Sequence, residues 1–248
     1  MHSKVLLKLC FIAFFCVLSF ITFGKETVNI VVGLTKPPYV IEKTQSGFEL
    51  ELITNVLNQL NKQPNYIFVP FGRSERMLNE HDIDIILTAN KQIIGDKAYL
   101  SEPYITYQNV AISLKKNELR IDKVADLANY SLATFQSAHK VLGNEFAKSA
   151  ELSPVYIQII KQQHQLEMLF KERVEVIIMD KNIFAYMLDK YYPGEDINQL
   201  SIHKIFPESL YSAAFKSHFS RNNFNQQLEV FLNSAQYHQL KQKYQLLN

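Results

Sequence analysis

The chain contains little cysteine, with two residues among 248, and both lie close to the N-terminus. Cys10 follows Leu9 and Cys16 follows Phe15, so neither has the small residue expected before a lipid-modified cysteine. This pattern argues against a lipoprotein. The rest of the chain has no thiol for a disulfide or a reactive site, so its stability must come from its core.

Charges are missing from fifteen consecutive residues, Leu9 to Phe23, which follow Lys4 and Lys8. A basic start, an apolar run of this length and a small residue at its end are typical of a secretory signal peptide. The run is short for a membrane span, which needs about 20 residues. We predict a signal peptide over residues 1–24, cleaved after Gly24, and a periplasmic protein. An uncleaved membrane anchor is the alternative.

Glycine and proline are also scarce, with seven and eight residues, and neither sign of charge dominates. The low glycine and proline content excludes a fibrous or disordered chain, and 47% hydrophobic residues are enough for a sizeable core. Without Lys4 and Lys8, the 26 basic residues become 24, equal to the 24 acidic ones. This balance gives no electrostatic footprint for nucleic acid.

Enzyme motifs are absent as well. The sequence has no Gly-x-Ser-x-Gly, no His-Glu-x-x-His and no Walker-type loop. We therefore expect no catalytic residue, no metal and no cofactor.

Apolar runs and amphipathic segments alternate from Thr27 onward, which indicates an α/β protein with parallel sheets. The order strand–helix–strand–helix–strand occurs twice. In the first unit the predicted strands are 28–34, 66–71 and 83–89, and the helices are 47–60 and 73–80. In the second unit the strands are 130–135, 155–160 and 174–179, and the helices are 137–149 and 163–172.

Two stretches repeat each other at an offset of 91 residues: MLNEHDIDIILTA at 77–89 and MLFKERVEVIIMD at 168–180. Each ends one of the two units, which suggests two lobes of similar plan. Extended segments at 104–116 and 208–216 indicate that the chain leaves lobe one and returns to it. We predict a clamshell with lobe one at 27–110 plus 208–248, lobe two at 111–207, and a two-strand hinge.

Ligands of open α/β sheets bind outside the carboxyl ends of the strands. The predicted ligand-binding residues therefore follow the strands, and they are Lys36, Tyr39, Phe71, Arg73, Thr88, Asn90, Gln136, Ser137, His139 and Asp180. Each has a purely structural alternative. Tyr39 could cap the core, and Asp180 could only cap the helix that follows it.

The chain resembles the periplasmic solute-binding proteins of family 3, the receptors of polar amino-acid importers. The matching segments are PPYV with GFELELI, DIDIILTA, YLSEPY, DLANYSLATFQSA, VEVIIMD and YHQLKQKY, in this order. The resemblance covers about residues 27–247. It implies the type II periplasmic binding fold, a small-molecule solute, an inner-membrane ABC permease as partner, and a monomer.

The resemblance also locates the family's ligand contacts. It places the acid that holds a ligand's ammonium group at Asp180, which is present. It places the arginine for the ligand carboxylate at Ile94 and a covering aromatic at Lys36, so both features are absent. Arg73 could supply a guanidinium instead. We expect a zwitterionic, amino-acid-like or anionic solute, held between an acid on one lobe and bases on the other.

Two other functions stay open at this point. Some proteins that resemble this family are dehydratases, and here Glu102, Asp180 and His139 would be the candidate acids and bases. The second of these is a ligand-sensing module whose closed form is recognised by a membrane partner.

Overall fold

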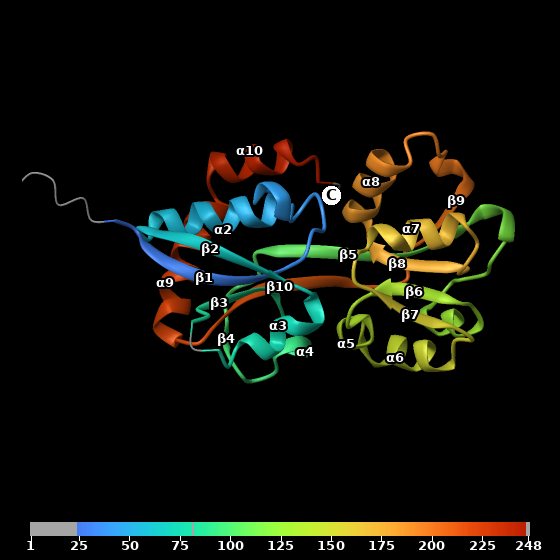
Figure 1. The fold of residues 1–248 in the computed structure, drawn as a ribbon, viewed down its shortest axis with the longest axis horizontal. Helices are drawn as coiled ribbons and strands as arrows, with labels where there is room; N and C mark the ends of the chain where they lie inside the picture. Colours follow the sequence, from blue (N-terminus) through green and yellow to red (C-terminus); the bar gives the residue numbers. More distant parts are fainter. Residues whose placement is uncertain (1–23, 81, 247–248) are drawn as a thin grey trace, which may run out of the picture.

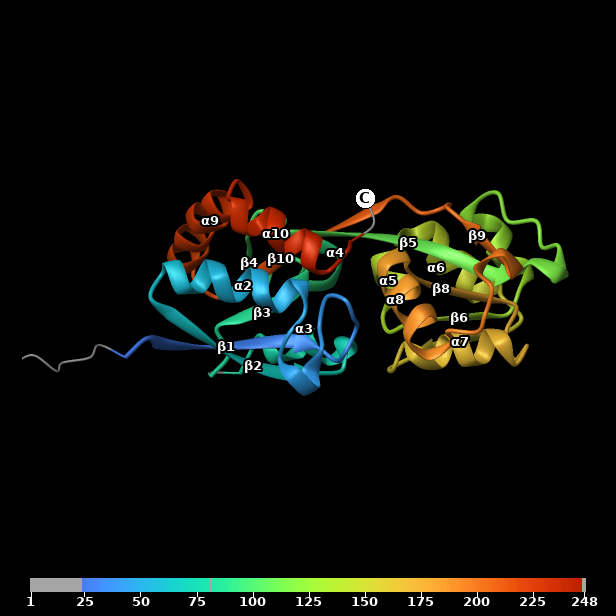
Figure 2. The ribbon, with the colours of Figure 1, turned by 90° about the horizontal axis from the view of Figure 1, so that it is seen from above.

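The computed structural model describes residues 24–80 and 82–246. The predicted signal peptide, with Cys10 and Cys16, lies outside the described residues. Two α/β lobes lie side by side along the long axis of the molecule (Figures 1 and 2). Within the described ranges, no helix is both long enough and apolar enough to cross a membrane.

Lobe one is built on three parallel strands, as predicted, in the order β2–β1–β3. These strands are β1 (Glu26–Gly33), β2 (Lys62–Val69) and β3 (Ile85–Ala89). β2 begins four residues before the predicted strand and contains Pro64. It lies at the edge of the sheet, where the missing N–H of a proline costs no ladder hydrogen bond.

Helix α2 (Phe48–Gln59) connects β1 to β2 and buries Phe48, Leu52 and Val56, which recur at helical spacing. Its N-cap, Gly47, has φ +121°, and a Cβ there would lie 2.3 Å from the carbonyl oxygen of Tyr39. Only glycine can therefore start the helix this close to the loop after β1.

Lobe two repeats this plan with β6 (Leu132–Phe135), β7 (Tyr156–Ile159) and β8 (Val176–Asp180). β6 pairs in parallel with both β7 and β8. Where the sequence predicts one helix at 137–149, the chain forms α5 (Ala138–Val141) and α6 (Gly143–Leu152). Gly143 has φ +89°, so the backbone leaves the right-handed helical region between them.

The two repeated stretches end in equivalent strands, since β3 and β8 keep the offset of 91 residues at both ends (85 to 176 and 89 to 180). Each strand pairs in parallel with the first strand of its own unit. Each also has an antiparallel neighbour, which is β10 (Glu208–Phe215) for β3 and β5 (Ile105–Leu114) for β8. The repeat therefore builds the same local topology twice.

β5 and β10 run between the lobes (Figure 1). They pair antiparallel from Ile105–Gln108 to Glu208–Tyr211 and then separate. β5 continues between β8 and β9 (Leu200–His203), whereas β10 continues beside β3 and β4 (Tyr99–Leu100).

Helices cover the faces of these sheets. The remaining helices are α3 (Phe71–Met77), α4 (Lys91–Ile94), α7 (Gln163–Phe170), α8 (Lys181–Tyr191), α9 (His218–Leu232) and α10 (Ala235–Lys243), with short 3-10 turns at Glu42–Thr44, Lys115–Asn117, Val124–Asn129 and Ile197–Gln199. α9 and α10 pack against α2 and so bring the end of the chain back to lobe one.

Candidate functional site

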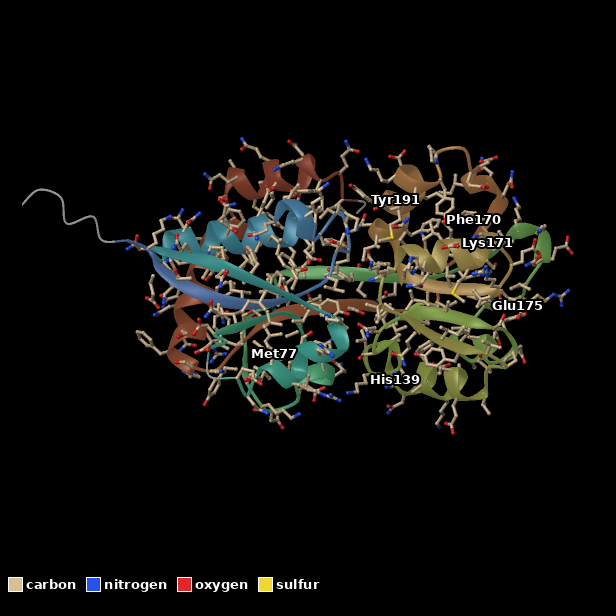
Figure 3. All side chains as sticks on the ribbon, in the orientation of Figure 1. Met77, His139, Phe170, Lys171, Glu175 and Tyr191 are labelled. Atoms are coloured by element: carbon tan, nitrogen blue, oxygen red, sulfur yellow. The ribbon has the colours of Figure 1, made fainter. Side chains whose placement is uncertain are left out.

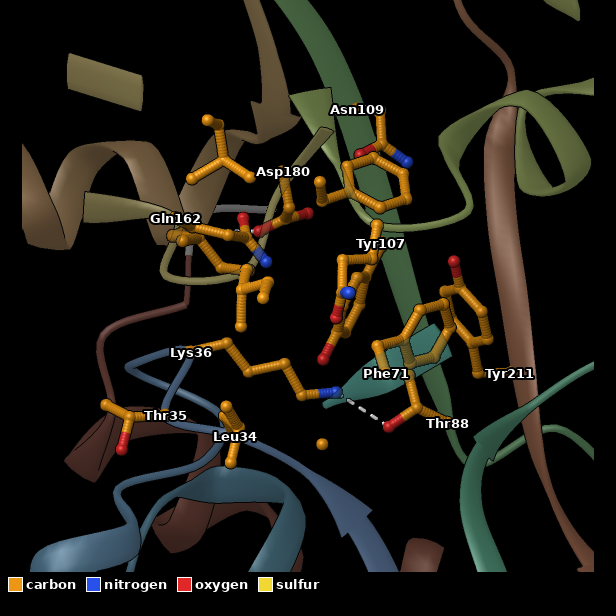
Figure 4. A pocket seen from close by; sticks show the side chains of 16 residues that line it. Leu34, Thr35, Lys36, Phe71, Thr88, Tyr107, Asn109, Gln162, Asp180 and Tyr211 are labelled. Carbon is orange, nitrogen blue, oxygen red and sulfur yellow. Dashed lines mark hydrogen bonds between the residues drawn. The ribbon is translucent and has the colours of Figure 1, made fainter. Parts of the chain in front are cut away.

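A cavity lies where the carboxyl ends of the strands of both lobes meet (Figure 4). It has about 600 Å³ of space free of protein atoms, a figure that includes space open to solvent. Its lining comprises Gly33, Leu34, Thr35, Lys36, Phe71, Thr88, Tyr107, Asn109, Phe135, Gln136, Ile159, Ile160, Gln162, Asp180, Ile183 and Tyr211.

Five of the ten predicted site residues line this cavity: Lys36, Phe71, Thr88, Gln136 and Asp180. They follow β1, β2, β3, β6 and β8 or end them. The carboxyl ends of parallel strands share one edge of a sheet, which is why residues far apart in sequence meet here.

Lys36 is the basic side chain of the cavity, and it is only 6% exposed. Its Nζ lies 3.1 Å from a carboxylate oxygen of Glu49, which is completely buried, and donates to Thr88 Oγ1 at 2.7 Å. Burial lowers the pKa of Lys36, and Glu49 opposes this shift. The charge of the lysine is therefore neutralised within its own lobe.

Glu49 has further donors besides Lys36. Thr88 Oγ1 donates to Glu49 Oε1 at 2.7 Å, and the Tyr104 hydroxyl donates to the same oxygen at 2.5 Å. The Thr88 backbone N–H donates to the Tyr104 hydroxyl, and Thr88 has φ +51°. The end of β3 is thus locked onto the Lys36–Glu49 pair by a closed hydrogen-bond network.

Asp180 ends β8 and is the acidic side chain of the cavity. Its Oδ1 accepts the backbone N–H groups of Asn182 and Ile183 at 2.9 and 3.1 Å, which caps α8. Its Oδ2 accepts the Gln108 N–H of β5 at 2.8 Å. Burial raises the pKa of Asp180, while these hydrogen bonds favour the carboxylate. The helix-cap alternative therefore describes a real role, and Asp180 faces the cavity as well.

Aromatic side chains from β5 and β10 form one wall of the cavity. Tyr107 stacks on Tyr39 with ring centroids 4.3 Å apart, and it meets Tyr211 edge-on at 5.0 Å. Lys36 Nζ lies 5.3 Å from the centroid of the Tyr107 ring. Tyr39 thus covers one face of the Tyr107 ring and Lys36 the other, and the wall offers apolar area to a ligand.

The other five predicted site residues do not line the cavity. Tyr39 is buried behind Tyr107, and its hydroxyl accepts a hydrogen bond from Asn182 at 2.8 Å. Arg73 is exposed on α3, and Asn90 caps α4 by accepting the Ile93 N–H. Ser137 precedes α5 in the left-handed region at φ +60°. His139 contacts Gln158 at 3.3 Å, on the part of lobe two that borders lobe one (Figure 3).

Neither position 94 nor the lysine near it brings a positive charge to the cavity lining for a ligand carboxylate. Ile94 is buried in the core and does not line the cavity. Lys91, at the start of α4, is exposed and lies 3.7 Å from Asp96. An arginine at position 94, where the resemblance places the one for the ligand carboxylate, would therefore enter the hydrophobic core.

Sequence reasoning missed several cavity residues, among them Leu34, Tyr107, Asn109, Phe135, Gln162 and Tyr211. Tyr107, Asn109 and Tyr211 lie within the crossing strands, which the sequence analysis treated only as connections. The available signal was the alternation of apolar and polar residues from Ile105 to Gln108, because it marks a strand whose two faces meet different environments. Glu49 gave no signal, because an acid in the first turn of a helix is normally solvated.

Contacts outside the cavity also join the lobes. Glu75 on α3 accepts from Lys97 at 2.8 Å in lobe one and from Lys140 on α5 at 3.3 Å. Asn182 on α8 donates to Tyr39. The lobes are therefore in contact on both sides of the cavity.

In the part of the chain that the structure describes, no group of three or more His, Cys, Asp and Glu side chains could hold a metal ion. Among the acid–base candidates, Glu102 is exposed and His139 lies outside the cavity, which leaves Asp180.

Solved structures match the chain over most of its length. An ancestral arginine-binding protein bound to arginine has a TM-score of 0.72 at 18% identity, covering 89% of this chain and 99% of that one. An ABC uptake transporter substrate-binding protein from Streptococcus pneumoniae with bound histidine has a TM-score of 0.72 at 17% identity, covering 88% and 92%. The ancestral amino-acid-binding protein AncCDT-1, a precursor of cyclohexadienyl dehydratase, has a TM-score of 0.70 at 16% identity, covering 88% and 95%.

At these identities the likeness shows the fold, a two-lobed binding-protein architecture. No curated protein matches the sequence. The model of the bacterial extracellular solute-binding proteins, family 3, matches residues 28–246. The chain therefore belongs to family 3 of the bacterial extracellular solute-binding proteins.

Proposed function

We propose that this protein binds a small polar solute with a cationic nitrogen in the cavity between its lobes. The observation that carries the proposal is Asp180, a buried carboxylate that lines the cavity while Lys36, across from it, is already paired with Glu49. A cation entering the cavity would compensate the charge of Asp180. The arginine and histidine seen in proteins of this fold each carry a basic side chain, which agrees with such a solute.

The lobes of the proposed clamshell are residues 27–110 with 208–248 and residues 111–207. The pairing of β3 with β10 and of β8 with β5 supports this division. The protein would act as a monomer, in the periplasm, after loss of residues 1–24. It would deliver its solute to an ABC permease of the inner membrane.

A thermal-shift screen of residues 25–248 tests the proposal against amino acids, amines, dicarboxylates, polyamines and phosphorylated compounds. A ligand at a hundredfold excess over its Kd stabilises the native state by about 2.7 kcal/mol. Calorimetry then measures Kd for the chain and for Asp180→Asn, in which binding should weaken strongly.

Two outcomes would contradict the proposal: a chain that binds none of the compounds, and a ligand that binds Asp180→Asn equally well. Product analysis after long incubation with each ligand addresses the enzyme alternative, because a binding protein returns its solute unchanged. Uptake by cells that carry or lack the gene distinguishes an importer receptor from a sensor.

A further inference from the structure

The buried charges at the cavity do not balance. Lys36 contributes one positive charge, and Asp180 and Glu49 contribute one negative charge each. Among the described residues that line the cavity, Lys36 and Asp180 are the basic and the acidic side chain. The group therefore carries a net charge of minus one, which one positive charge on a ligand would cancel.

Lys36 is poorly placed to hold a carboxylate. Its ammonium group already meets Glu49 at 3.1 Å and Thr88 at 2.7 Å. A ligand carboxylate next to it would also approach the Glu49 carboxylate, and like charges in a buried site repel. Arg73 and Lys91 are exposed and lie outside the lining, so they bring no second base to the cavity.

The lobe-two side offers hydrogen-bond acceptors. Gln162 lines the cavity near Asp180 (Figure 4). Its Oε1 is buried without a hydrogen-bond partner among the described residues. An unsatisfied buried acceptor costs free energy, and a ligand N–H would satisfy it once rotation of the Gln162 amide turns this oxygen toward the cavity. This second observation, independent of the charges, also favours a ligand that donates N–H groups.

Four further lining side chains are polar but neutral: Thr35, Thr88, Asn109 and Gln136. The others are apolar or aromatic, including Phe71 and Phe135 from opposite lobes and Tyr107 and Tyr211 from the crossing strands. Such walls bind the carbon skeleton of a ligand and stabilise a cation through ring faces. They offer a carboxylate no charged partner.

We propose that the ligand is a small organic monocation without a carboxylate, namely an amine that carries an apolar or aromatic body. This inference rests on the proposed function, since it specifies the solute of the same cavity. It departs from the amino-acid and anionic solutes that the sequence suggests. The ammonium group faces Asp180 and Gln162, and the body of the ligand lies against the aromatic wall.

Matched pairs of compounds test this inference, because each amine differs from its amino acid only by the carboxylate. The pairs are tyramine with tyrosine, histamine with histidine and phenethylamine with phenylalanine, measured by calorimetry at neutral pH. We expect at least one amine to bind about tenfold or more tightly than its partner, which corresponds to about 1.4 kcal/mol.

Equal or tighter binding of the amino acids overturns the inference and leaves the proposed function intact. The same holds if another solute with a cationic nitrogen binds while all three amines fail. If no compound of any class binds, the proposed function fails as well, so the two failures can be told apart.

Glu49→Gln tests the physical cause, because it frees the charge of Lys36 while glutamine still offers an acceptor to Thr88 and Tyr104. The preference for the amine should fall about tenfold or more. Glu51→Gln, the same substitution two residues along α2, is the matched control and should leave the preference unchanged. An unchanged preference in a folded Glu49→Gln protein overturns the explanation, and if that variant does not fold, the paired compounds decide.

Discussion

Removal of Lys36 should destabilise the protein far more than removal of an ordinary surface lysine. Lys36 is 6% exposed and Glu49 is not exposed at all, so Lys36→Met leaves a buried carboxylate without a counter-charge. Breaking a buried ion pair from one side costs about 3–5 kcal/mol. This is a large share of the total stability of a typical domain, about 5–15 kcal/mol.

The double variant Lys36→Met with Glu49→Gln should recover most of this loss. A neutral glutamine needs no counter-charge, and its carbonyl oxygen still accepts from Thr88 Oγ1 and the Tyr104 hydroxyl, which now donate to Glu49. Replacement of both members of a buried pair is often close to neutral. The double variant should therefore be more stable than Lys36→Met alone, a coupling that a double-mutant cycle measures.

Equilibrium urea unfolding, followed by circular dichroism, supplies the free energies. The control is Lys62→Met, which breaks a surface pair with Glu26 whose N–O distance is 2.7 Å and whose side chains are 30% and 69% exposed. Such pairs contribute about 0–1 kcal/mol. If Lys36→Met costs no more than this control, or if the double variant is less stable than Lys36→Met, the buried pair does not hold the site together as described.

Three further predictions concern the cavity and its closure. Asp180→Ala should lower the free energy of unfolding by about 2–4 kcal/mol, because it removes the cap of α8 and leaves buried N–H groups without an acceptor. Asp180→Asn still caps α8 and should cost clearly less. Equal losses for the two variants on urea unfolding would refute this. Burial raises the pKa of Asp180, so its carboxylate is protonated at a higher pH in the folded state than in the unfolded chain. The affinity for a cationic ligand should therefore fall as the pH drops through this raised pKa. Calorimetry from pH 4 to 7 measures the fall, which should be small in Asp180→Asn. Lys140→Ala removes the ion pair to Glu75 of the other lobe and should weaken ligand binding about two- to fivefold at low salt. The difference in affinity between the variant and the unchanged protein should shrink at high salt, because salt screens the pair.

The strands could be predicted from sequence because they are short apolar runs, and the long helices because their apolar residues recur with a period of about four. α4, β4 and β9 were missed, since elements of two to four residues are too short to show a period. The break between α5 and α6 depends on one positive φ at Gly143 and was read as a continuous helix.

The candidate site was only partly predictable. Strand ends locate the edge where a ligand binds, but the turn after each strand decides where its side chains point. Thr88 and Ser137 both have positive φ, yet Thr88 lines the cavity and Ser137 does not. Glu49 could not have been found, because its burial depends on Lys36, Thr88 and Tyr104, which long-range packing brings to α2.

The crossing of β5 and β10 between the lobes also affects how the chain folds during synthesis. The strands β5 to β9 lie within residues 105–203, so lobe two can assemble its sheet as soon as this stretch is available. β3 must wait for β10, and α2 must wait for α9 and α10, which are made last. An incomplete lobe one therefore presents an open strand edge and an uncovered apolar helix face until the final forty residues or so arrive. A truncation just before β10, which removes residues 208–248, should trap the chain in this state, and it should aggregate although the strands of lobe two are all present.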